Sequence, residues 1–177
     1  FDTEELRVAE TMIECIEATD IPVCMVGLLT ALPSTQLTRR LEKEGRLLPF
    51  ADETLGDQCT AGLNFVTRRP RIDILRDYRA ILEATYRPSA YFERVRRSGL
   101  NLRRPSHPVT ARPVLSARDR NTLLRLMWRM TVTHPFLARY FWRTFVSIAR
   151  HNPAALETVV IQITLYLHLG PFAKSVV

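Results

Sequence analysis

The stretch IPVCMVGLLTALPSTQLTRRLEKEGRL, residues 21–47, decides the fold that the sequence predicts. It opens with an apolar run over residues 23–32 that is rich in Val, Leu and Met and has a proline on each side. Such a run predicts a β-strand, residues 22–32, that is buried on both faces. A turn at 33–35 then starts a helix that ends at Gly45. Strands of this kind belong to parallel sheets with several partner strands, so the stretch predicts the end of a larger α/β domain.

The residues on either side complete a helix–strand–helix unit and a long connection. Residues 4–19 carry an apolar stripe and acidic side chains in the first turn, and Thr3 can cap them, which predicts a helix. Residues 48–70 contain two glycines, two prolines and three acids without periodicity, which predicts an unusually long connection.

Helices dominate the rest of the predicted structure. Apolar periodicity, capping residues and prolines predict helices that begin near residues 71, 89, 116 and 135. The second of these is short, and its Arg94, Arg96 and Arg97 are expected on the side opposite the apolar residues. Residues 99–115 contain one glycine and three prolines, which predicts a linker between two helical groups.

The segment 154–169 fits two structures. Its second half alternates apolar and polar residues, which is typical of a strand, but its apolar residues also recur at helical spacing. The cap at Asn152-Pro153 and the Gly170-Pro171 pair at the end favour a helix.

The sequence is poor in groups that carry chemistry, and no catalytic residue is predicted. The cysteines Cys15, Cys24 and Cys59 are widely spaced and form no CxxC or CxxxCxxC motif, so no zinc or iron–sulfur ligand set can be identified, and buried free thiols are expected. The histidines have no metal-ligand spacing either, which favours capping or core-edge roles; they are His107, His134, His151 and His168.

The N-terminus lacks the pattern of a signal peptide, and no uninterrupted apolar run approaches the ~20 residues that span a bilayer. Both absences predict a cytoplasmic protein, with association at a membrane surface as a further option that depends on charge.

Positive charge is concentrated in the C-terminal part. Residues 101–177 carry eleven basic and two acidic side chains, within a net charge of +7 for the chain. Arginines alternate with aromatic residues along part of this region, which predicts a basic surface that attracts an anionic partner, either a membrane or nucleic acid. The predicted surface comprises Arg118, Arg125, Arg129, Arg139 and Arg143. The alternative is that the aromatic residues are core and the arginines are solvated, and the exposure of Trp142 decides between them. Specific nucleic-acid binding is not expected, since no base-reading motif is present.

Four phrases of the sequence carry a family resemblance. The phrases are VGLLTALPSTQL at 26–37, RLEKEGRL at 40–47, LNFV at 63–66 and YRPSAYFERV at 86–95. In this order and spacing they resemble the end of the barrel, and the uncharacterised helical domain after it, in cobalamin-binding radical S-adenosylmethionine proteins. Phe1-Asp2-Thr3 resembles the family's "GFD" phrase with its glycine lost by truncation, and Ser34 departs from the family's usual glycine.

The resemblance implies a mainly α fold, in which a helical C-terminal domain follows a helix–strand–helix fragment of a partial TIM-type barrel. The implied domains are the barrel fragment 1–47, a connecting loop 48–70 and a helical accessory domain 71–177, which has a sub-boundary at 99–115. In the full-length protein, the rest of the barrel and a cobalamin domain would be partners. The edge of the isolated strand would also favour pairing with a second copy.

The resemblance further implies radical chemistry, typically methylation of an unactivated carbon, with S-adenosylmethionine, a 4Fe-4S cluster and cobalamin as cofactors of the full-length protein. Val26, Leu28 and Thr30 would form an apolar wall against the adenine of S-adenosylmethionine. No cofactor and no activity are expected for the chain alone. The competing hypothesis is a non-enzymatic helical module whose basic face binds a membrane or nucleic acid. A CxxxCxxC motif upstream of Phe1 would decide for the enzyme.

Overall fold

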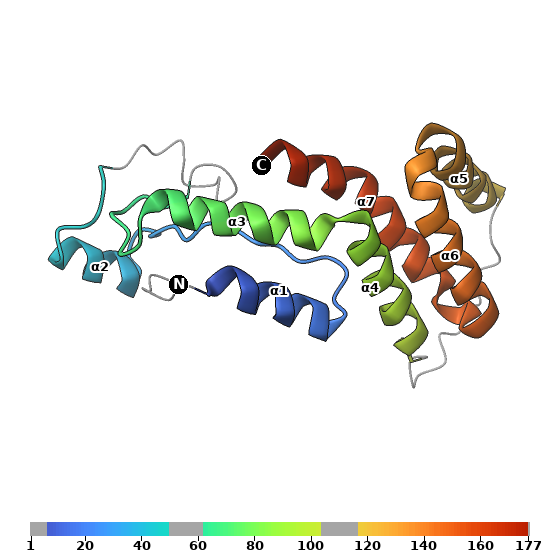
Figure 1. The fold of residues 1–177 in the computed structure, drawn as a ribbon, viewed down its shortest axis with the longest axis horizontal. Coiled ribbons are helices and arrows are strands. Elements are labelled where there is room, and N and C mark those ends of the chain that lie inside the picture. The colour runs from blue at the N-terminus through green and yellow to red at the C-terminus, as the bar shows by residue number, and fades with distance from the viewer. Residues whose placement is uncertain (1–6, 50–61, 104–116, 177) are drawn as a thin grey trace.

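The computed structural model describes residues 7–49, 62–103 and 117–176, and it is mainly helical (Figure 1). The helices, in chain order, are α1 (Val8–Thr19), α2 (Gln36–Lys43), α3 (Arg71–Tyr86), α4 (Pro88–Asn101), α5 (Ala117–Trp128), the π-helical turn η2 (Arg129–Thr133), α6 (Pro135–His151), the 3-10 turn η3 (Pro153–Ala155) and α7 (Leu156–Val176). The predicted fold class, mainly α with a helical C-terminal domain, is confirmed. The predicted cap Thr3 and the cysteine Cys59 lie outside the described residues.

The strand predicted over residues 22–32 is wrong for the part of the chain that the structure describes. These residues run alongside α3 without a neighbouring strand, and the described ranges contain only one isolated bridge, between Leu47 and Phe65 (Figure 1). The segment is not buried on both faces either, because Leu28 is 5% exposed whereas Met25 is 98% exposed. Apolar sequence can favour an extended backbone, but a strand also needs a partner for its ladder of hydrogen bonds.

The helix predicted after Pro33 is confirmed as α2. Thr35 is its N-cap, and the Thr35 hydroxyl accepts a hydrogen bond from the Thr38 N–H at 3.3 Å. After the helix, Gly45 has φ of +65°, a conformation that costs glycine little. The sequence therefore determined both ends of this helix.

Helix α4 is longer and more central than predicted. It begins at Pro88 and runs to Asn101, so residues 99–101 belong to the helix and not to a linker. It packs against α3, α6 and α7 (Figure 1). Gly99 allows the close approach, because a Cβ there would lie 2.5 Å from Cγ2 of Val159 on α7. The rest of the predicted linker, residues 104–116, lies outside the described ranges.

The segment 154–169 is helical, as the caps favoured, and forms most of α7. The expected end at Gly170 is wrong, since the helix continues to Val176 with Pro171 inside it. The helix has a buried face that includes Val159, Ile163 and Tyr166. The buried face continues past Gly170 at Ala173, which is 5% exposed, and this packing favours a longer helix than the local stop signal indicates.

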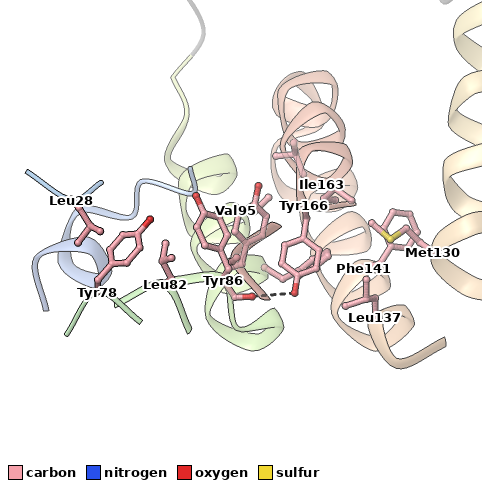
Figure 2. Close-up of a cluster of buried hydrophobic side chains, with 14 of the residues drawn as sticks. Leu28, Tyr78, Leu82, Tyr86, Val95, Met130, Leu137, Phe141, Ile163 and Tyr166 are labelled. Carbon is pink, nitrogen blue, oxygen red and sulfur yellow. Dashed lines mark hydrogen bonds between the residues drawn. The ribbon is translucent and has the colours of Figure 1, made fainter. Parts of the chain in front are cut away.

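A continuous apolar core joins the N-terminal segment to the distal helices (Figure 2). At its centre, the rings of Tyr91 and Tyr166 lie 4.9 Å apart, and Phe92 meets Tyr166 edge-on at 5.2 Å. The Tyr91 hydroxyl donates to the Gln162 carbonyl at 2.7 Å, and the Tyr166 hydroxyl donates to the Tyr86 carbonyl at 3.1 Å. These contacts join α7 to α4 and to the end of α3, since buried tyrosines are stable when their hydroxyls find partners.

Candidate functional site

The extended segment after α1, residues 21–32, forms hydrogen bonds with a short loop, residues 62–66. The loop pairs with the segment as a neighbouring strand would. The Leu63 N–H donates to the Leu29 carbonyl at 2.9 Å. The Asn64 side chain donates to the Ala31 carbonyl at 3.0 Å and accepts from the Ala31 N–H at 2.8 Å. An amide side chain that pairs with both groups of one residue reproduces the pattern of a ladder.

Gly62 sets the distance between this loop and the segment. A Cβ at Gly62 would overlap the Leu28 Cβ and would lie 3.1 Å from the Leu28 carbonyl oxygen. The next residue, Leu63, has φ of +64°, in the left-handed region that side chains rarely adopt. The Arg71 guanidinium stabilises this strained turn by donating to the Leu63 carbonyl at 2.7 Å and to the Gly62 carbonyl at 3.1 Å.

Tyrosines of α3 hold the first half of the segment in the same way. The Tyr86 hydroxyl donates to the Cys24 carbonyl at 2.7 Å, and the Tyr78 hydroxyl donates to the Val26 carbonyl at 3.4 Å. Burial raises the pKa of both Tyr86 and Cys24, so both groups stay protonated at neutral pH. The Cys24 thiol is therefore a weak nucleophile and a poor metal ligand in this environment.

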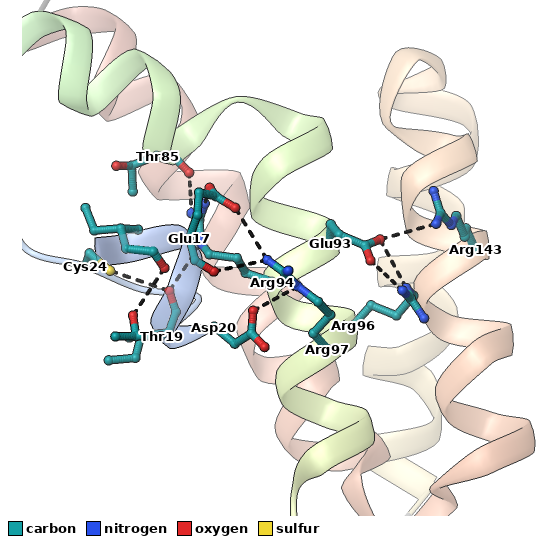
Figure 3. Close-up of polar contacts among 12 residues, drawn as sticks. Glu17, Thr19, Asp20, Cys24, Thr85, Glu93, Arg94, Arg96, Arg97 and Arg143 are labelled. Carbon is teal, nitrogen blue, oxygen red and sulfur yellow. Dashed lines mark hydrogen bonds and ion pairs between the residues drawn. The ribbon is translucent and has the colours of Figure 1, made fainter. Parts of the chain in front are cut away.

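Arg94 joins four parts of the chain (Figure 3). Its side chain is fully buried, which contradicts the predicted position opposite the apolar face. The guanidinium donates to the Ile21 carbonyl at 3.2 Å, to the Thr85 carbonyl at the end of α3, and to the Glu17 carboxylate on α1. Arg94 follows Tyr91 by three residues, so helical spacing alone places it on the buried face. A buried arginine needs such partners, and the sequence did not show where they would come from.

A largely apolar pocket of about 370 Å³ lies between α1, the extended segment and α3. Of the three residues predicted to form an adenine wall, Val26 and Leu28 line the pocket and Thr30 does not. Leu28 also packs beside Tyr78 in the core (Figure 2). The Thr30 hydroxyl is buried without a hydrogen-bond partner among the described residues. An ion pair between Arg69 and Asp77, at 2.8 Å, adds a polar group to the lining.

The described residues do not fit an iron–sulfur cluster or another metal centre. Within the ranges that the structure describes, no group of three or more His, Cys, Asp or Glu side chains lies together. The expectation of buried thiols is wrong for Cys15, which is exposed on α1, and Cys24 on the extended segment is only partly buried. The lining of the pocket is largely apolar, and Val26 and Leu28 contribute hydrocarbon surface to it.

The arginines of the predicted basic surface have different environments in the structure. Arg139 lies over the Tyr140 ring at 4.5 Å, and Arg143 forms an ion pair with Glu93 on α4 at 3.4 Å. Arg96 hydrogen-bonds to Glu93, and this bond, more than Arg143, lowers the pKa of the Glu93 carboxyl (Figure 3). Arg143 is therefore partly neutralised.

The exposure of Trp142 was expected to distinguish an interaction surface from core aromatic residues with solvated arginines. In the structure the Trp142 side chain packs against its neighbours. Its indole N–H donates to the Thr131 hydroxyl at 3.1 Å, and its ring meets Phe141 edge-on at 5.1 Å. Arg125 and Arg129 remain exposed, beside a different aromatic residue, Trp128. The side chain of the fifth predicted arginine, Arg118, lies outside the description.

One described helix is long and apolar enough to cross a membrane by length and composition alone. It covers Pro153–Ser175, and 28% of its apolar 18-residue stretch is buried. The prediction from the sequence considered only uninterrupted apolar runs and did not identify this helix, which includes Gln162, Thr164 and His168. It packs against α3, α4 and α6 on one side, whereas Ile161, Leu165 and Phe172 are exposed.

Two known proteins that the chain resembles are named as methyl-transferring enzymes. An uncharacterized methyltransferase of Synechocystis sp. is 35% identical over 175 residues, which cover 98% of this chain and 31% of that protein. Hopanoid C-2 methylase of Rhodopseudomonas palustris is 23% identical over 178 residues, which cover 98% of this chain and 32% of that protein. The chain thus spans about a third of the length of the curated relatives it matches. No solved structure matches it.

A family model also matches most of the chain. The model described as "Domain of unknown function (DUF4070)" matches residues 35–177, from the cap of α2 to the last residue. The match includes the loop 62–66, the buried Arg94 and all helices described from α2 onward. The chain belongs to the DUF4070 family.

Proposed function

We propose that this chain forms the C-terminal region of a cobalamin-dependent radical S-adenosylmethionine enzyme that transfers a methyl group to an unactivated carbon. The names of the two relatives, a methyltransferase and a methylase, support methyl transfer as the reaction class. In this proposal residues 1–47 end the barrel, 48–70 connect, and 71–177 form an accessory helical domain. The chain alone has no activity, because the cluster and cobalamin sites belong to the rest of the protein.

The observation that carries the proposal is that only some of the backbone groups of the extended segment have hydrogen-bond partners among the described residues. The loop 62–66 and the tyrosines of α3 engage its backbone at several points. Among the described residues, none bonds to the backbone groups of Gly27 or Leu28, and the Met25 side chain is 98% exposed. A pre-extended segment with free backbone groups and an uncovered apolar side chain is suited to receive a neighbouring strand.

In the full-length enzyme, Val26, Leu28 and Thr30 would contribute to the adenine site. Support comes from the apolar pocket lined by Val26 and Leu28, together with the unpartnered hydroxyl of Thr30. S-adenosylmethionine supplies a radical and a methyl group when bound, whereas these residues would only position its adenine against an apolar surface.

The test compares Met25→Asp with the control Ile72→Asp in two proteins, the 177-residue chain and the full-length protein. Ile72 is also exposed, at 56%, but lies on the first turn of α3. Neither change should alter the unfolding free energy of the chain. In the anaerobically reconstituted full-length protein, Met25→Asp alone should abolish release of 5′-deoxyadenosine and transfer of a labelled methyl group, because a charge would be buried beside the neighbouring strand.

Full activity of the Met25→Asp full-length protein would refute the strand-docking part of the proposal. Absence of S-adenosylmethionine cleavage in the unmutated full-length protein would refute the reaction class. The same uncovered segment supports self-association of the chain by itself, which light scattering would detect and Met25→Asp would remove.

The alternative function, a non-enzymatic module that binds an anionic surface, is favoured by one observation: Trp128 is 67% exposed between two exposed arginines.

A further inference from the structure

Helix α5 and the turn η2 have apolar residues on two opposite sides. The inward side carries Leu126 and Met130, which are 7% and 0% exposed. The outward side carries Leu124, Trp128 and Val132, which are 56%, 67% and 52% exposed. The outward residues recur every four positions, so they form one stripe along the helix surface. Sequence periodicity detected only the inward side.

Two arginines flank this stripe. Arg125 follows Leu124, and Arg129 follows Trp128, so the two guanidinium groups lie one turn apart on the same surface. Both are exposed, and neither forms an ion pair with any residue in the described ranges. Together with Leu124, Trp128 and Thr133 they line a shallow depression of about 420 Å³. We call this surface, residues 124, 125, 128, 129 and 132, the Trp128 patch.

The position of the Trp128 patch makes it accessible. Helix α5 lies at the end of the molecule opposite α2 (Figure 1). The π-helical turn η2 closes with a hydrogen bond from the His134 N–H to the Arg129 carbonyl at 3.0 Å, just before Pro135 starts α6. Single π-helical turns are rare and often occur at functional sites.

We propose that the Trp128 patch docks on the anionic surface of a lipid membrane, with Trp128 and Leu124 in the interfacial layer and Arg125 and Arg129 on lipid phosphates. Indole rings favour the membrane interface, because one edge is apolar and the N–H can stay hydrated. Arginine binds phosphate through paired N–H groups, and its long side chain reaches headgroups beside a buried apolar stripe. The inference does not depend on methyl transfer.

The chemistry of the patch favours lipid over other anionic partners. Leu124 and Val132 have aliphatic side chains, which gain from hydrocarbon but offer no stacking surface to a nucleic-acid base. A second copy would place Arg125 and Arg129 of both chains near each other in a symmetric contact, and like charges there would repel. The exposed stripe on α7, which includes Ile161 and Leu165, has no arginine beside it and is not part of the patch.

The test measures co-sedimentation of the chain with vesicles of phosphatidylglycerol and phosphatidylcholine, and with phosphatidylcholine alone. We expect binding only to the anionic vesicles, with loss at high salt. Arg125→Glu with Arg129→Glu should weaken binding at least about tenfold, since each basic side chain near an anionic surface contributes measurably. The matched control, Arg39→Glu with Arg87→Glu, reverses the same charge on exposed residues away from α5 and should have a much smaller effect.

A second measurement reports insertion. The chain has two tryptophans, so Trp142→Phe leaves Trp128 as the single fluorophore. Its emission should shift to the blue with anionic vesicles, and brominated lipids should quench it. Trp128→Ala should weaken binding several-fold, whereas Ile72→Ala, which also shortens an exposed apolar side chain, should not.

Three outcomes would overturn the inference. The first is equal binding by the two double charge-reversal variants. The second is Trp128 emission that does not change on vesicle binding. The third is Trp128-dependent binding to duplex DNA, or Trp128-dependent dimerisation without lipid, at the expense of vesicle binding; these results would assign the patch to nucleic acid or to a second copy.

Discussion

The extended segment 21–32 and the helices α4 and α7 lie in one continuous core, but they are held in different ways. The segment is fixed by hydrogen bonds that distant side chains donate to its backbone, from Asn64, Tyr86 and Arg94. The two helices satisfy their own backbones and meet through packed rings such as Tyr91 and Tyr166. The first arrangement depends on a few specific groups, whereas the second spreads its stability over many contacts. Substitutions should therefore have sharper local effects in the N-terminal region.

The largest expected effect is that of Arg94→Met. The substitution leaves the Thr85 carbonyl buried without its donor and removes the link to Glu17, so we expect the free energy of unfolding to fall by about 3 kcal/mol. Urea unfolding measures the loss, and hydrogen exchange should rise in α1 and near Ile21 while α7 stays protected. Arg97→Met is the control, since this half-exposed neighbour pairs with Asp20 and should cost at most about 1 kcal/mol. Equal losses, or a uniform rise in exchange, would contradict the distinction between the two regions.

The next largest effect should distinguish two buried glycines, one in each region. In Gly62→Ala the new methyl group meets the Cβ and backbone of Leu28, which cannot move away, so we expect a loss of about 1–3 kcal/mol. In Gly99→Ala it meets Cγ2 of Val159 at 2.5 Å and Cδ1 of Ile148 at 2.8 Å, which are side-chain ends that can shift. The loss at Gly99 should be the smaller one by urea unfolding. The reverse order would show that the helical core is the less adaptable region.

The smallest effect concerns alkaline pH and the helical core. Burial raises the pKa of Tyr166 to about 12, with a smaller contribution from Tyr140. The unfolded chain loses this proton near pH 10 while the folded chain keeps it, so stability should fall as the pH rises from about 10 to 12. The slope for one such tyrosine is at most about 1.4 kcal/mol per pH unit. Tyr166→Phe should reduce the slope of unfolding free energy between about pH 10 and 11, and an unchanged slope would show that other groups cause it.

Several features of the fold follow from the sequence because they depend on nearby residues. The cap at Thr35, the stop at Gly45 and the helix Arg71–Tyr86 were all predicted from local signals. The helical state of 154–169 was also favoured correctly by its caps. The order of the phrases in the chain led to the hypothesis of a radical S-adenosylmethionine protein, and the names of two relatives, a methyltransferase and a methylase, support the methyl-transfer part of it.

The environment of individual side chains was decided only by the tertiary structure. Arg94 was predicted opposite the apolar residues because its charge disfavours burial, although its spacing from Tyr91 allows the buried face. Its carbonyl and carboxylate partners come from α1, the extended segment and the end of α3, and they make burial favourable. Trp142 packs against its neighbours, while Trp128 is exposed. An apolar residue in a sequence specifies only that it gains from burial. Whether it is buried depends on which other surface the folded chain brings to it.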